Sequence, residues 1–216
     1  MDKKLDLSYT TSPWAWHSKY VGCWQIKIPI GPEKARVFGH GCLLDLINDL
    51  FGITGDLFFP TQVENPQKHE LFERPMPMPP GIVREALDRH WSFQFILDEN
   101  YVPACDIYGL SYIHVNNPGG VVRALVPHAL GFKLDCTGWT GHDPTANLTV
   151  YTKCDAWLER TVDGLDNSAI GVKNSAILTG KLKELEERLA GNIIEYLTEF
   201  EEVEIEKYSI RSRPRL

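Results

Sequence analysis

A long run of apolar residues at helical spacing constrains the fold of this chain more than any other feature. Between 174 and 200 apolar side chains recur every three or four residues, at Leu178, Leu182, Leu185, Leu189, Ile193, Tyr196 and Phe200. This spacing places them on one side of a helix of about seven turns, with charged residues on the other sides. The pattern predicts a long amphipathic helix over 174–200 that packs on a sheet, because the stripe is short for a coiled coil.

Period-two patterns elsewhere predict strands. Between Tyr20 and Ile30, the residues Trp24, Ile26 and Ile28 fall on one side of the alternation, which indicates a strand with one buried face. Similar short patterns follow at 91–97, 109–115, 120–126, 131–136, 147–153 and 203–205, and Gly, Pro and Asn separate most of them. A shorter helix is expected over 42–51, where Leu43, Leu46, Ile47 and Leu50 recur at helical spacing.

These elements predict an α+β fold in which a mostly antiparallel sheet of about six strands packs against the helix 174–200. The expected organisation is a single domain over 20–206, with an N-terminal arm at 1–19 and a C-terminal tail at 207–216. The segment 60–80 contains six prolines and is expected to be an extended loop within that domain.

The composition indicates which general class of protein this chain belongs to. A chain of 216 residues with 43% hydrophobic and 24% charged residues is typical of a soluble globular protein, and its net charge of −7 argues against nucleic acid as the main partner. No apolar run reaches the length of a membrane span, and no secretory signal is evident. Five widely spaced cysteines fit reduced thiols, so we expect a cytoplasmic protein, or a virion protein if the source is a phage or virus.

The three extended segments favour a structural subunit of a larger assembly, for example a head–tail connector or tail component of a virion. Polar termini and proline-rich arms usually become ordered on neighbouring proteins in an oligomer or larger complex. The expected contact residues are two tryptophans, two methionines and three arginines of these segments: Trp14, Trp16, Met76, Met78, Arg211, Arg213 and Arg215.

An alternative hypothesis is a cysteine-dependent acyl-transfer or hydrolytic enzyme. Cys42 stands at the start of the expected helix 42–51, where unpaired N–H groups and the helix dipole favour a thiolate. His40 is then the candidate base and Asp45, or alternatively Asp49, its orienting carboxylate, while other histidines stay open as partners. The competing interpretation of Cys42 is a buried small apolar residue, which describes most free cysteines.

A further alternative follows from the order of the elements. A strand, a helix, several antiparallel strands and a long C-terminal helix resemble the order in helix-grip lipid-binding folds. That resemblance implies an apolar cavity between the sheet and the helix 174–200, and a carrier of apolar small molecules. The chain has no Cys-x-x-Cys or His-Glu-x-x-His motif and no phosphate loop, so neither a metal nor another cofactor is expected.

Overall fold

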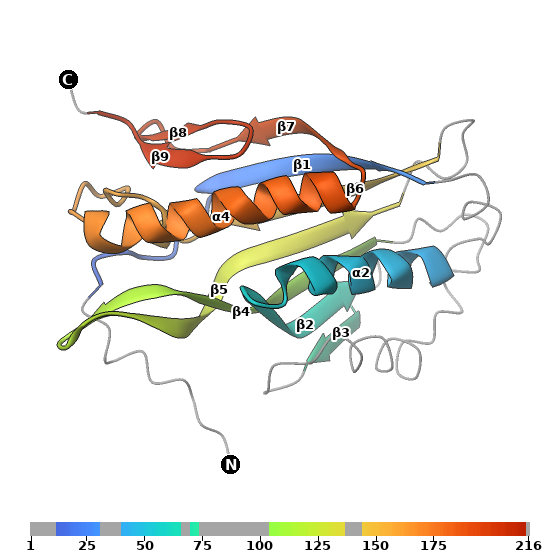
Figure 1. The fold of residues 1–216 in the computed structure, drawn as a ribbon, viewed down its shortest axis with the longest axis horizontal. Helices are drawn as coiled ribbons and strands as arrows, with labels where there is room; N and C mark the ends of the chain where they lie inside the picture. The colour runs from blue at the N-terminus through green and yellow to red at the C-terminus, as the bar shows by residue number, and fades with distance from the viewer. Residues whose placement is uncertain (1–11, 31–39, 66–69, 74–103, 137–143, 215–216) are drawn as a thin grey trace, which may run out of the picture.

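The computed structural model describes residues 12–30, 40–65, 70–73, 104–136 and 144–214, and they form a seven-stranded antiparallel sheet with two helices on one face (Figure 1). The strand order is β3-β2-β4-β5-β6-β1-β7, and β8 and β9 form a separate hairpin. The elements are β1 (Gly22–Pro29), α2 (His40–Thr54), β2 (Phe58–Asn65), β3 (Glu70–Glu73), β4 (Ala104–Asn117), β5 (Gly120–Asp135), β6 (Thr145–Thr152), the short 3-10 helix η4 (Asp155–Trp157), α4 (Ser168–Arg188), β7 (Asn192–Leu197), β8 (Val203–Ile205) and β9 (Ile210–Ser212).

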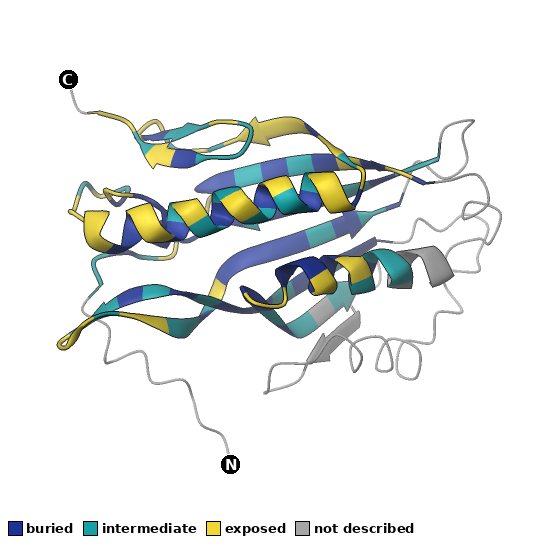
Figure 2. Ribbon diagram, viewed as in Figure 1, coloured by how far each residue is buried: buried dark blue, intermediate teal, exposed yellow. Residues whose placement is uncertain are grey.

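The core lies between the sheet and the two helices. Trp24, Ile26 and Ile28 of β1 are at most 3% exposed, which confirms the buried face predicted for this strand. The helices bury Leu50 of α2 and Leu182 of α4 on their sheet-facing sides, and Figure 2 shows exposed residues on their outer sides. Lys181 of α4 pairs with Asp56 just beyond α2, so the two helices also contact each other on this face.

The prediction for the C-terminal helix is wrong in its boundaries. The helix α4 starts at Ser168 and ends at Arg188, and residues 192–197 form strand β7. The chain leaves the helix at Ala190, which has a positive φ of 49°, and at Gly191, where a Cβ would lie 2.7 Å from the Ile26 side chain. Ile193 keeps its helical spacing in the sequence, but it is buried by pairing beside Ile26 in the sheet.

The expected arms are not confirmed where the structure describes them. Residues 12–20, which we call the N-terminal strap, pack on the body of the protein: Trp14 is 7% exposed and Trp16 forms a bridge with Cys154. Part of the proline-rich segment 60–80 belongs to β2 and β3, and Pro60 stands where the register of β2 against β4 shifts, a position that tolerates proline. The tail contributes β9 to the C-terminal hairpin.

Candidate functional site

The sheet face that points away from α2 and α4 carries polar and aromatic side chains in rows. On the covered face, Ile107, Phe132, Val150 and Trp24 are cross-strand neighbours and at most 1% exposed. The residues before and after each of them point to the opposite face, because side chains alternate along a strand. The helices therefore leave these alternate residues to a second surface of the sheet.

Two adjacent rows cross this second face. The first, the tyrosine row, runs from β2 to β7 through Gln62, Tyr108, Gly131, Tyr151, Cys23 and Leu197. The second, the charged row, runs through Glu64, Asp106, Lys133, Thr149, Gln25 and Glu195. The rows lie roughly 7 Å apart, since they are two residues apart along each strand.

A bulge in β5 hollows this face beside the tyrosine row. On β4 only Gly109 lies between Tyr108 and Leu110, whereas His128, Ala129 and Leu130 occupy the corresponding stretch of β5. His128 takes a left-handed conformation with φ of 53°. Bulges of this kind redirect side chains and are frequent beside functional sites.

The hollow is a cavity of ≈ 320 Å³, which we call the sheet-face pocket. Its lining joins the sheet to the N-terminal strap and comprises Trp16, His17, Tyr20, Asp106, Tyr108, His128, Leu130, Gly131, Lys133, Thr149, Tyr151 and Lys153. A volume of this size lies at the lower end of the range of small-molecule sites, about 300–1,000 Å³.

The middle of the pocket is aromatic. The Tyr151 ring contacts Gly131, where a Cβ atom would be only 2.5 Å from the ring, so any larger residue would displace it. Burial raises the pKa of both Tyr108 and Tyr151, and their hydroxyls share a hydrogen bond. Tyr20 packs edge-on against Tyr151, with 5.3 Å between ring centres.

One end of the pocket carries opposite charges from the charged row. Asp106 and Lys133 are direct cross-strand neighbours. The Oδ1 atom of Asp106 is buried and has no hydrogen-bond partner. Burial raises the pKa of Asp106, Lys133 opposes this effect, and Glu64 reinforces it. A buried acceptor without a partner is costly, so this carboxyl is suited to accept a hydrogen bond from a bound molecule.

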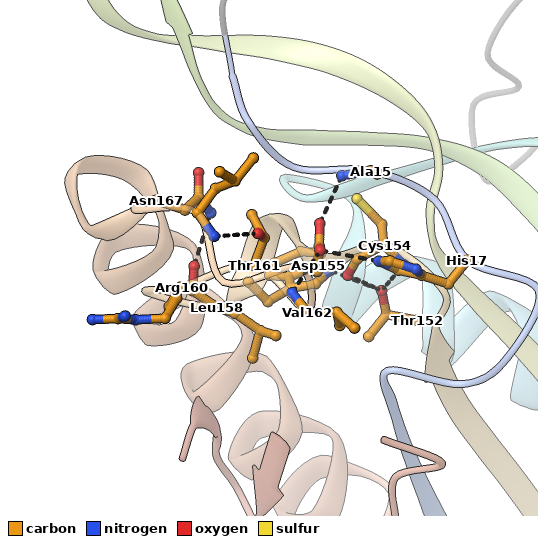
Figure 3. A network of polar contacts seen from close by, with 12 residues as sticks. Ala15, His17, Thr152, Cys154, Asp155, Leu158, Arg160, Thr161, Val162 and Asn167 are labelled. Atoms are coloured by element: carbon orange, nitrogen blue, oxygen red, sulfur yellow. Dashed lines mark hydrogen bonds and ion pairs between the residues drawn. The ribbon is translucent and has the colours of Figure 1, made fainter. Parts of the chain in front are cut away.

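The strap closes the other end, and a buried carboxylate fixes it there (Figure 3). The side chain of Asp155 is 0% exposed and accepts hydrogen bonds from Ala15 N at 2.7 Å, Val162 N at 3.0 Å and His17 Nε2 at 3.0 Å. Backbone hydrogen bonds from His17 N to Lys153 O and from Asp155 N to Ala15 O run beside them. His17 therefore lines the pocket in an orientation set by Asp155, with its other face against Phe200.

The structure does not bring the predicted catalytic residues to this pocket. His40 begins α2, and Asp45 lies half-buried on the same helix, on the opposite face of the sheet (Figure 1). The side chains of His40 and Cys42 lie outside the described part of the structure, so their proposed chemistry stays a prediction. Cys23 is the half-buried described cysteine, and burial, with Glu195 and Glu199, raises its pKa to about 11. Its thiol is therefore protonated at neutral pH.

The predicted contact residues have separate environments. Trp14 is buried, while Trp16 is 44% exposed, lines the sheet-face pocket and donates from its indole nitrogen to Pro127 O. Arg211 pairs with Glu204 and Glu206 within the C-terminal hairpin. Arg213 lines a shallow hollow beside Arg160. Met76, Met78 and Arg215 lie outside the described residues.

Sequence patterns alone missed the pocket residues, except Trp16, which was expected to contact a partner. The signal was present in the predicted strands 131–136 and 147–153, whose solvent-side positions carry Lys133 and Tyr151 instead of simple polar residues, whereas Asp106 lies before the predicted strand 109–115. Within the described ranges no cluster of three metal-ligating side chains occurs, and no helix there could span a membrane.

No protein-family model, curated protein or solved structure matches this chain.

Proposed function

We propose that this protein binds a free aromatic amino acid, or a close derivative, in the sheet-face pocket. The observation that supports it best is the unpartnered Asp106 Oδ1 directly across from Lys133. An α-ammonium group would donate to Asp106, and the adjacent α-carboxylate would pair with Lys133. Charge-assisted contacts of this kind are stronger than neutral hydrogen bonds.

The tyrosine row, next to the charged row, would contact the aromatic part of the ligand. A ring that extends from the charged row would pack on the outer side of the Tyr108 and Tyr151 rings, one row further along the strands. Offset or edge-on aromatic contacts favour such a site beyond the area that is buried. The hydroxyl of Tyr108 would donate to a polar atom of the ligand.

Titration calorimetry with L-tyrosine, L-phenylalanine and L-tryptophan tests this proposal. We expect saturable binding of at least one of them, and a loss of roughly 10- to 100-fold in affinity for Lys133→Gln, since a hydrogen bond to a charged group contributes about 1.5–3 kcal/mol. Lys27→Gln is the matched control, because Lys27 is an exposed lysine of β1 outside the pocket. Absence of binding, or equal loss in both variants, would refute the proposal.

A second candidate function is the assembly subunit expected from the sequence, now through β7 rather than through arms. β7 is an edge strand of the sheet, and Ile194, Tyr196 and Leu197 on it are 37–50% exposed. We propose that a second copy of this chain adds its β7 antiparallel to this edge, with the two Tyr196 rings facing each other. That register places Glu195 opposite Leu197 and keeps the two Glu195 carboxylates apart.

In sedimentation equilibrium the wild-type chain should then form a dimer, and Tyr196→Lys should dissociate it. Val172→Lys is the control, because Val172 is an apolar residue on α4 with a similar exposure, 52% against 45% for Tyr196. A wild-type monomer at all concentrations would exclude this dimer.

A further inference from the structure

The pair of His17 and Asp155 has the arrangement of a general base held by a carboxylate. Asp155 accepts a hydrogen bond from His17 Nε2 at 3.0 Å, so the neutral imidazole carries its proton on Nε2 and its lone pair on Nδ1. Asp155 is itself held by the Ala15 and Val162 N–H groups, which leaves its position little freedom. In serine and cysteine hydrolases, a side chain that accepts a hydrogen bond from the catalytic histidine orients it in the same way.

The position of this pair along the pocket agrees with a catalytic use. From the charged row, β6 runs through Thr149 and Tyr151, and Lys153 follows just after the strand ends. The N–H group of His17 donates to Lys153 O. An aromatic amino acid held at Asp106 and Lys133 would therefore extend its ring toward His17, Lys153 and His128. The group on the far end of that ring would meet the histidine and a cation.

We propose that the protein hydrolyses an ester on the distal end of the bound aromatic amino acid, with His17 as general base. This inference rests on the proposed binding function. His17 Nδ1 takes a proton from water, whose oxygen forms a bond to the ester carbonyl carbon. Lys153 stabilises the negative charge that develops on the carbonyl oxygen. The carbon–oxygen bond to the ring then breaks, and the proton on His17 passes to the phenolate, which leaves a carboxylic acid and the free amino acid.

The experiment uses O-acetyl-L-tyrosine as substrate and follows the release of L-tyrosine. We expect hydrolysis above the uncatalysed rate, and a fall in kcat of about 10²- to 10⁴-fold for His17→Gln, the usual contribution of a general base. Glutamine can still donate to Asp155, so KM and the affinity for L-tyrosine should stay within about 3-fold. The matched control is His114→Gln, whose histidine is held at 3.2 Å by Asn174 away from the pocket and should keep full activity.

Two outcomes would overturn the inference. If L-tyrosine binds but O-acetyl-L-tyrosine is not hydrolysed, or if His17→Gln is as active as the wild type, His17 is not a base, while the proposed binding function stands. If neither compound binds, both proposals fail. Should His17→Gln not fold, His17→Asn takes its place, because asparagine also lacks an imidazole, and full activity of that variant would exclude His17 as the base.

Discussion

Replacing Asp155 by alanine is expected to lower the free energy of unfolding by about 3–5 kcal/mol. The substitution would leave the partly buried N–H groups of Ala15 and Val162 without acceptors, and it would release His17. Each orphaned donor alone costs about 1–3 kcal/mol. Urea unfolding followed by circular dichroism measures the loss, and limited proteolysis should show faster cutting within the N-terminal strap.

Asp163→Ala provides the control for this prediction, because Asp163 is an exposed aspartate a few residues further along the chain. Its effect should stay within about 0.5 kcal/mol, as for most surface substitutions. Equal stability of the two variants would mean that the three hydrogen bonds to Asp155 contribute little. In that case the strap would be held by its apolar contacts, chiefly those of Trp14.

Two glycines of the same helix should respond in opposite directions to the same substitution. A Cβ at Gly171 would lie 2.1 Å from Leu158 O and 2.4 Å from Leu158 C, both backbone atoms that cannot move aside as a side chain would. Gly171→Ala should therefore destabilise the protein by about 1–3 kcal/mol. At Gly180 no atom lies within 4 Å of the added Cβ, so Gly180→Ala should stabilise it by about 0.5–1 kcal/mol through helix propensity.

Thermal unfolding of both variants checks this pair. The difference between them isolates the close approach of α4 to the Leu158 backbone, since both substitutions add the same methyl group to the same helix. If both alanines stabilised the protein, the contact between α4 and the segment after η4 would be looser than the structure shows.

The sequence was sufficient to predict a mostly antiparallel sheet and strands within β1, β4, β5 and β6, but not β2, β3 and β7 or the end of the main helix. Strand β1 was predictable because Trp24, Ile26 and Ile28 alternate with polar residues and are all buried. The error after Arg188 arose because Ile193 and Tyr196 continue the helical spacing by coincidence. The decisive contact is tertiary: Ile193 pairs beside Ile26, a residue 167 positions earlier, and no local pattern reports such a contact.

The pocket could not be predicted from the sequence because it, too, depends on tertiary contacts. It combines side chains from β4, β5 and β6 with a strap far away in the chain. Pro127 and Gly131 flank the bulge at His128 that hollows the face, but these two residues do not specify its conformation. A histidine with a positive φ is a conformation that only the surrounding structure imposes. The assembly, cysteine-enzyme and apolar-carrier hypotheses remain predictions beside the proposal made from this pocket.

The place of β1 in the sheet has a consequence for how the protein is made on the ribosome. β1 is inserted between β6 and β7, and the strap before it docks on Asp155, 140 residues away from Ala15. Strands β6 and β7 are therefore synthesised long after β1. Until they emerge from the ribosome, the apolar side of β1 stays unpaired. Pairings this distant form slowly and leave strands exposed to wrong partners in the meantime. Nascent chains cut short before β7 should consequently depend on chaperones far more than the finished protein does.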